Sequence, residues 1–260
     1  MMMLSRNLLV ILFALLPCIS ALAQRLNPLS PAPDWSRLEA FQETMTREEF
    51  VRLLDTVYAP GNAAAGMIEV REGDAVIFKT LSPPETMTLR FAKDAVSAKP
   101  GERFWRPAAK MGPSTTGKPL AGVRIALDPG HIGGDWALME ERSFRSGDGK
   151  PVQEGDMTLL VSKLAAAQLR ALGAEVSLVR EDSVPSSPFT VEALRVEARK
   201  ELGLTGNGTS RENYDGPRDP LKMNTVQWQA ERLFYRVAEI QERARKVNDK
   251  IHPDLTVCIH

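Results

Sequence analysis

The chain of 260 residues contains only two cysteines, Cys18 and Cys258. Cys18 lies in the N-terminal segment 1–23, which has the pattern of a cleavable signal peptide described below. We expect its removal to leave a single thiol. A disulfide framework is therefore excluded, and so is a zinc site built from cysteines. Cys258 lies inside an apolar run typical of a buried strand, and we expect it to be a small core residue.

The chain also lacks a surplus of charge of either sign. Lysine and arginine together number 33, as do aspartate and glutamate, so the formal net charge is zero. Nucleic-acid-binding proteins normally carry a basic surplus, and we therefore expect no nucleic-acid partner. Beyond the N-terminus no apolar run approaches the length of a bilayer, so we expect no stable membrane span after signal cleavage.

The first residues show the pattern of a secretory signal peptide. A positive charge precedes an apolar core at residues 8–16 that is too short to span a bilayer, and a small-x-small cleavage site ends at Ala23. We predict a signal peptide over 1–23, a mature chain beginning at Gln24, and a periplasmic or secreted bacterial protein. The alternatives are an uncleaved membrane anchor and a lipid attachment site at Cys18.

Proline and glycine divide the rest of the chain into two parts. Residues 24–35 are proline-rich and predict a linker or an extended arm. Residues 36–110 predict a small α+β module of unknown role, with a capped helix after Thr46 and strands at about 67–70, 75–81 and 86–91. A segment rich in glycine and proline then precedes the main domain, 122–260.

The main domain begins with a β-α-β pattern. The apolar run 123–127 predicts a buried strand, and 156–172 predicts an amphipathic helix closed by Gly173. A second strand is predicted at 175–179. This order implies a parallel pair of strands joined by a right-handed crossover.

A long connection and a long helix complete the predicted domain. The connection 183–224 contains a helix at 191–202 and a stretch rich in glycine, asparagine, aspartate and proline. It is either a lid or autoinhibitory cap, or a surface elaboration without a regulatory role. A helix over about 225–251 leads into a third buried strand at 255–259. We therefore predict an α/β fold, a parallel sheet flanked by helices.

Two histidines follow predicted strands of this sheet. The heptapeptide 128–134, Asp-Pro-Gly-His-Ile-Gly-Gly, comes directly after the first strand, and His260 follows the third. The carboxyl ends of parallel strands form the edge at which open sheets bind ligands. Glycines let the backbone turn sharply there, so that His131 points across the edge. The alternative is a glycine-rich loop that binds phosphate.

Glu154 supplies a third candidate ligand. It lies just before the amphipathic helix, which places its carboxylate at the same edge as both histidines. Two histidines and a glutamate form a common zinc set that leaves a fourth position for water. We therefore predict a Zn²⁺ site at His131, Glu154 and His260. His252, before Pro253 at a helix end, is expected to have a surface or capping role.

Several segments carry a family resemblance in the same order along the chain. They are the strand leading into 128–131, Glu154 at a helix start, 172–176, 179–182, and a helix with Arg243 and Asn248 that leads to His260. With these segments, 122–260 resembles the catalytic domain of the zinc-dependent N-acetylmuramoyl-L-alanine amidases, which include the bacterial cell-division amidases. The resemblance is to a domain truncated at its C-terminus.

The resemblance implies a fold, a metal and a substrate. The fold is a parallel sheet flanked by helices, incomplete at the C-terminus, and His131, Glu154 and His260 are the zinc ligands. The substrate is peptidoglycan, cut between the lactyl group of N-acetylmuramic acid and the L-alanine of the stem peptide by zinc-activated water. The resemblance also allows an activator protein as a partner.

The chain departs from the family pattern in three places. Ile132 replaces the usual glycine after the first histidine, and 183–224 is longer than a minimal amidase needs. The family's catalytic base is a glutamate that follows the second histidine, which places it beyond residue 260. We therefore expect the chain to hold the metal ligands without the base. We also expect an exposed strand edge, an uncovered helix face and poor solubility.

Other side chains near the predicted site have ordinary interpretations. We expect Glu140 and Glu141 to be solvated surface groups rather than to approach the metal. We expect Asp128 to structure its turn through backbone hydrogen bonds, and Trp136 to pack rather than to line a sugar or peptide groove.

Three functions remain open from the sequence. The first is a peptidoglycan amidase. The second is a non-catalytic zinc- and peptidoglycan-binding or regulatory protein that lacks the base. The third is an unrelated α/β protein that binds an anion at the glycine loop.

Overall fold

The computed structural model describes residues 27–31, 33–81, 84–101, 105–112, 117–204 and 211–260. The chain divides into two compact units, Met1–Glu102 and Arg103–His260. The predicted signal peptide, 1–23, lies outside the described residues. Among the residues that are described, no helix combines the length and the apolar character needed to cross a membrane.

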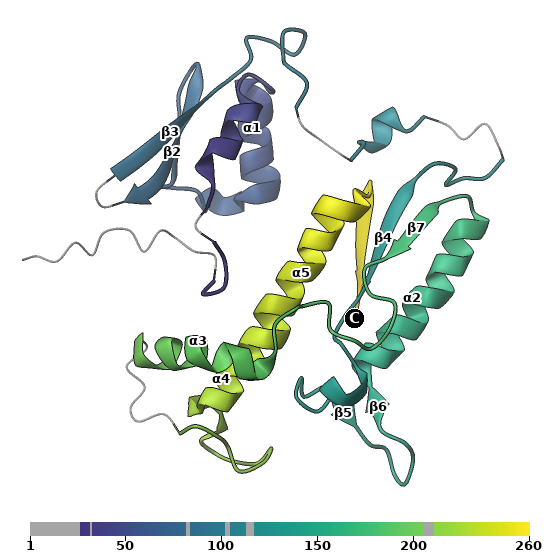
Figure 1. Cartoon of the computed structure of the whole chain (residues 1–260). Coiled ribbons are helices and arrows are strands. Elements are labelled where there is room, and N and C mark those ends of the chain that lie inside the picture. The colour runs from purple at the N-terminus through teal and green to yellow at the C-terminus, as the bar shows by residue number, and fades with distance from the viewer. Residues whose placement is uncertain (1–26, 32, 82–83, 102–104, 113–116, 205–210) are drawn as a thin grey trace, which may run out of the picture. The chain divides into compact units, whose positions relative to one another are not determined.

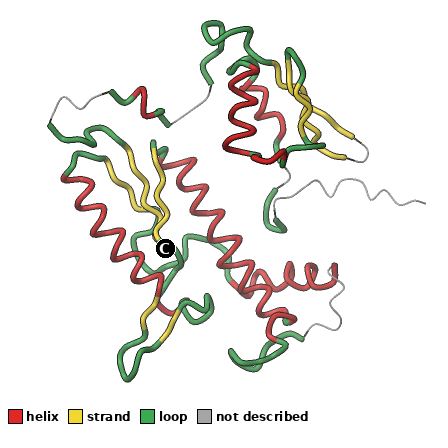
Figure 2. The backbone as a smooth tube through the Cα atoms, turned by 180° about the vertical axis from the view of Figure 1, so that it is seen from behind, coloured by secondary structure: helices red, strands yellow, loops and turns green. Residues whose placement is uncertain are grey.

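The first unit contains a small antiparallel sheet and a short helical segment (Figures 1 and 2). Its strands are β1 (Ile68–Val70), β2 (Asp74–Leu81) and β3 (Pro84–Arg90), paired in that order. After the 3-10 helix η1 (Trp35–Phe41), helix α1 (Arg47–Leu53) continues into the π-helical η2 (Leu54–Tyr58). These elements lie where the sequence predicts strands and a helix.

The start and the packing of α1 follow from its side chains. Thr46 caps the helix, because its hydroxyl oxygen accepts a hydrogen bond from the N–H of Glu49 at 3.3 Å. Phe50 then packs against Phe91, just after β3, with ring centroids 5.2 Å apart. This aromatic contact joins the helix to the sheet.

The second unit is an α/β fold with a three-stranded parallel sheet, as the sequence predicts. The strand order is β7 (Glu175–Leu178), β4 (Arg124–Pro129) and β8 (Leu255–Ile259). Helix α2 (Glu154–Ala171) connects β4 to β7, and α5 (Glu239–Lys246) lies on the path to β8. The two helices flank the strands, and the chain ends beside the start of α2 (Figure 1).

The core of this unit lies between β4 and α2. Ile125 and Leu127 of β4 are buried together with Ala166 of α2 and Ala174, which precedes β7. The central strand β4 is thus the most buried strand of the sheet, with neighbours on both of its edges.

A long helical segment leads to β8. It comprises α4 (Val226–Arg232), the π-helical η7 (Leu233–Ala238), α5 and the π-helical η8 (Val247–Ile251). Thr225 caps its start by accepting from the N–H of Trp228 at 3.2 Å. His252 occupies the C-cap position in a left-handed conformation (φ 51°), in agreement with the expected helix-end role.

The described part of the insertion 183–224 packs on this long segment. Its helix α3 (Val191–Leu204) contacts α4 and η7. Leu194 and Ala198 of α3 are buried, as is Phe234 of η7. The insertion is therefore anchored to the helix that leads to the last strand.

The exposure of β8 corrects the prediction of a third buried strand. Leu255 is 53% exposed, and Cys258 is exposed rather than a core residue. Within the described chain β8 pairs only with β4, so it is an edge strand. Helix α2 exposes Leu160 and Leu164, at 59% and 62%, in agreement with the expected uncovered helix face. Composition alone does not distinguish an edge strand from a central one.

A buried carboxylate fixes the opposite end of the sheet. Asp254, just before β8, has a fully buried side chain and accepts hydrogen bonds from the N–H groups of Arg106 and Arg124, each at 3.0 Å. The guanidinium groups of both arginines hold the pKa of Asp254 well below its usual range. Because of these contacts, residues near 106 belong to the second unit, although the sequence placed the module's end at 110.

Candidate metal centre

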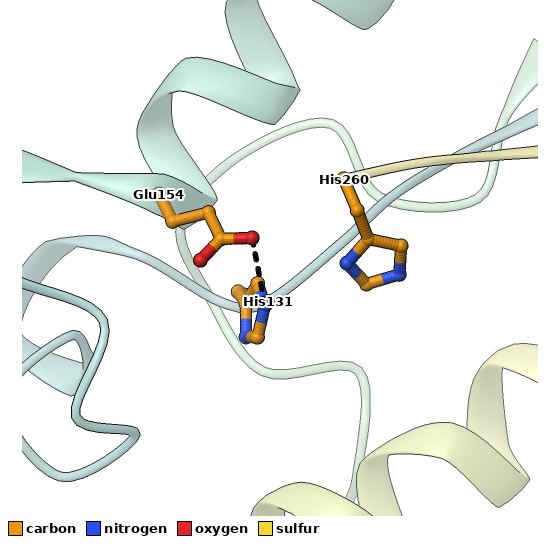
Figure 3. A group of neighbouring side chains, drawn as sticks. All are labelled: His131, Glu154 and His260. Atoms are coloured by element: carbon orange, nitrogen blue, oxygen red, sulfur yellow. Dashed lines mark ion pairs between the residues drawn. The ribbon is translucent and has the colours of Figure 1, made fainter.

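The three predicted ligands come from separate elements and meet at the carboxyl edge of the sheet (Figure 3). His131 follows β4, Glu154 is the first residue of α2, and His260 follows β8. His131 Nε2 lies 3.1 Å from Glu154 Oε1. The two imidazole rings stand 5.3 Å apart and nearly perpendicular, at 86°. One ligand atom from each residue lies within 4.8 Å of the other two.

This group fits a zinc ion. Zinc bonds of about 2.0–2.1 Å in a tetrahedral site place ligand atoms about 3.3 Å apart. His131 and Glu154 already have this spacing, and His260 requires a small approach. Across the described residues, this is the one group of histidine, cysteine and acidic side chains that converges in this way. The donor set, two imidazoles and a carboxylate, is typical of a zinc site with a fourth position open.

Arg243 holds the backbone of the loop that carries His131. His131 has a left-handed conformation (φ 57°), which is uncommon for a residue with a side chain. The Arg243 guanidinium donates to the carbonyls of His131 and Pro129, both at 2.7 Å. It also pairs with the carboxylate of Asp128 at 3.3 Å. Asp128 therefore faces Arg243 and is not a member of the metal group.

Burial raises the pKa of Asp128, although Arg243 acts in the opposite direction. The sequence predicts that this residue structures its turn through backbone hydrogen bonds. The structure instead pairs its carboxylate with the buried Arg243. Arg243 was part of the family resemblance, but its partners in the loop, Asp128 and His131, lie more than a hundred positions earlier in the chain.

A second carboxylate connects this arginine to the insertion. Glu239 accepts from Arg243 Nε at 2.8 Å, and the same carboxylate accepts from the N–H of Ser187 at 2.9 Å. All three residues are buried. The start of the insertion 183–224 is thus joined, through two buried charges, to the loop that positions His131.

The N-terminus of α2 packs directly against the same loop. A side chain at Gly155 would place its Cβ 2.2 Å from the backbone nitrogen of Gly133, so only glycine fits there. Thr158 donates to the carbonyl of Gly130 at 2.6 Å, and Arg180 donates to the carbonyl of Gly155 at 2.9 Å. These contacts fix the position of the neighbouring Glu154.

Glu140 is buried and binds this loop, which corrects its predicted place on the surface. Its carboxylate accepts from the N–H groups of Ile132 at 2.9 Å and Gly133 at 3.4 Å. The Asp156 carboxylate accepts from the N–H of Gly134 at 3.0 Å. Because the chain's own carboxylates occupy these three N–H groups, the structure disfavours a phosphate-binding loop.

Glu140 also faces His131. Its Oε1 lies 3.7 Å from His131 Nδ1, on the side of the ring away from Glu154. This separation is longer than a hydrogen bond, so the contact places a negative charge beside Nδ1 without fixing the ring, and it leaves Nε2 directed to the metal position.

The remaining candidates are as expected. Glu141 is exposed and pairs with Lys222 at 2.7 Å. Trp136 packs against Phe234 with ring centroids 5.2 Å apart, which supports its packing role.

Comparisons with known proteins add no relative: no protein-family model, no curated protein and no solved structure matches the chain.

Proposed function

We propose that the chain binds Zn²⁺ through His131, Glu154 and His260, and that this centre serves hydrolysis of an amide bond in peptidoglycan. The bond is the one between N-acetylmuramic acid and the L-alanine of the stem peptide. The observation that supports the metal is the convergence of three ligands from three separate elements. The ordered family resemblance supports the choice of bond.

The residues around the centre have distinct parts in this chemistry. A bound zinc ion lowers the pKa of its water toward about 7 and polarises the substrate carbonyl. His131, Glu154 and His260 occupy three positions and leave one side of the site open. Glu140 places a carboxylate beside the His131 ring, and Arg243 holds the backbone of His131. Glu140 is not proposed as the catalytic base, because the loop N–H groups already occupy its carboxylate.

The proposed setting is the cell envelope. The signal-peptide pattern of 1–23 supports export to the periplasm or beyond, where peptidoglycan is found. An activator protein is proposed as a further partner on the resemblance alone.

The principal alternative is a zinc- and peptidoglycan-binding protein without catalysis. The contacts of Glu140 favour it, because this carboxylate beside His131 is already occupied by loop N–H groups and so does not supply a base. Both functions require the same three ligands, and they differ only in whether the amide bond is cut.

Release of peptide from peptidoglycan distinguishes the amidase from the non-catalytic binding protein. The chain, with and without one equivalent of zinc, would be incubated with purified peptidoglycan, and soluble products identified by mass spectrometry. Zinc-dependent release of stem peptides that begin with L-alanine, absent in His131→Ala, supports the amidase. Zinc-dependent binding without release supports the alternative. A chain that binds neither zinc nor peptidoglycan would contradict both functions.

A further inference from the structure

Two cavities meet at the candidate metal centre. The first has a volume of about 500 Å³ and includes Glu154 in its wall. The second has a volume of about 520 Å³ and includes His131. Arg142 and His260 belong to the walls of both cavities. The metal ligands therefore lie where the two cavities join, so a substrate bond at the metal would have one side in each.

The first cavity is apolar away from the metal. Phe144 of β5 (Ser143–Phe144) lines it together with Met157 and Val161 of α2. All three side chains are exposed, Phe144 at 62%. Exposed apolar side chains gathered in one concave site are typical of a ligand-binding surface. The two other charged residues of its wall, Glu141 and Arg142, are paired with Lys222 and Glu154. This cavity therefore suits an uncharged group with apolar faces.

The second cavity is lined by one face of the long helical segment. Arg236, Ile240 and Arg243 are spaced four and three residues apart, so they lie on the same side of the helix. Arg243 is buried, and Arg236 is exposed. The helix thus places one arginine at the base of the cavity and another at its open side.

The charges at the base of this cavity are already paired. Arg243 binds the carboxylates of Asp128 and Glu239, and Glu140 binds backbone N–H groups. Arg236, by contrast, forms no ion pair with any carboxylate in the part of the chain that the structure describes; its guanidinium lies over the ring of Tyr235, at 5.5 Å from the centroid. Arg142, which lines both cavities, pairs with the metal ligand Glu154 at 3.4 Å. Arg236 is therefore the lining arginine that is available to a ligand carboxylate.

We propose that the second cavity binds the acidic stem peptide, with Arg236 pairing with a peptide carboxylate, and that the first cavity binds the uncharged lactyl and sugar side. This inference rests on the proposed function and adds the direction in which the substrate lies across the metal. The muramyl side of the bond has no free carboxylate, whereas an acidic peptide on the amine side offers several. Arg236 is thus a specificity residue for the leaving peptide.

A matched pair of ligands tests this direction. The first is N-acetylmuramoyl-L-alanyl-D-glutamate with a methylene in place of the scissile N–H, so that no hydrolysis intervenes. The second is the same compound with both carboxyls converted to amides. Dissociation constants for the zinc-loaded chain would be measured by calorimetry. We expect the acid to bind about fivefold more tightly than the diamide, the range of one exposed charge pair.

Single-residue variants test whether Arg236 causes the preference for the acid over the diamide. Arg236→Gln should lose the preference for the acid while its affinity for the diamide and its zinc content stay unchanged. Arg218→Gln, an exposed arginine outside both cavities, should keep the preference. Phe144→Ala should raise the dissociation constants of both ligands by the same factor. Equal affinity for acid and diamide in the unaltered chain, or a preference that survives Arg236→Gln, overturns the inference. Loss of zinc binding, or of binding to both ligands, instead contradicts the proposed function.

Discussion

The Arg243 guanidinium donates a hydrogen bond of 2.7 Å to the main-chain carbonyl of His131, 112 positions earlier in the sequence. His131 is thus held in a left-handed conformation by a buried charge on a different element. The position of this metal ligand depends on the long helix as well as on its own glycine-rich loop.

Replacement of Arg243 by lysine tests this dependence. Lysine retains the charge but lacks the planar fork that reaches the His131 and Pro129 carbonyls together. We expect zinc affinity to fall by about 10- to 100-fold, as when partners of metal ligands are removed. Competition with a chromophoric chelator measures the affinity. Arg245→Lys, an exposed position on the same helix, should bind zinc normally. Unchanged affinity in Arg243→Lys would show that the fork has no part in the site.

Gly130 determines the space available to His260. A Cβ at this position would lie 2.5 Å from the His260 ring and 2.7 Å from the carbonyl oxygen of Ile259. Gly130→Ala should therefore displace His260 and weaken zinc binding by at least about tenfold, while helix content by circular dichroism is retained. Gly203→Ala, where a Cβ meets nothing within 4 Å, is the matched control. Normal zinc binding by Gly130→Ala would mean that His260 is not a ligand.

Cys258 reports on the exposure of β8. It lies opposite Asp128 in the sheet register and lines the second cavity. Burial of the thiol and the nearby Asp128 carboxylate raise its pKa, although the residue as a whole is exposed. We expect a neutral maleimide to label it under native conditions, slowly near pH 7 and faster as pH rises. Cys258→Ser provides the background. Labelling only in the presence of denaturant would show instead that β8 is buried, as the sequence predicts.

Asp254 should make the free energy of unfolding depend on pH. Its folded pKa is lowered by Arg106 and Arg124, and its unfolded pKa is about 3.9. The unfolded chain therefore binds the proton first as pH falls. The stabilisation is complete above about pH 5 and is lost as pH falls below 4 toward the folded pKa.

Asp254→Asn should lower Tm at pH 7 by about 5 °C, with a smaller difference at pH 3. Thermal unfolding followed by circular dichroism at several pH values measures both. Asp215→Asn, at an exposed ion pair, should leave Tm nearly unchanged. An equal loss of Tm at both pH values would contradict the pKa assignment.

Local patterns were sufficient to predict the main elements. The apolar run before Asp128 predicts β4, and the periodic apolar positions between Glu154 and Gly173 predict α2. Because β-α-β order fixes a parallel pair, the sequence also places His131 and Glu154 at one edge of the sheet.

Contacts between distant residues could not be predicted in the same way. Glu140 reads as a surface residue until the loop N–H groups that it binds are in place. The exposure of Cys258 depends on the absence of a second neighbour for β8 in the described sheet, which its apolar composition does not reveal. The short hairpin of β5 and β6 (Val152–Gln153), which brings Phe144 to the first cavity, has too few residues for a periodic signal.

Zinc stoichiometry across single histidine variants tests the central claim most directly. After equilibrium dialysis against buffered zinc, metal content would be measured in the unaltered chain and in His131→Ala, His260→Ala and His252→Ala. We predict about one zinc ion per chain, retained in His252→Ala and lost in the other two, because His252 lies at a helix end outside the metal group. Zinc that remains bound in His131→Ala and His260→Ala, or that is absent from the unaltered chain, would contradict the proposed centre.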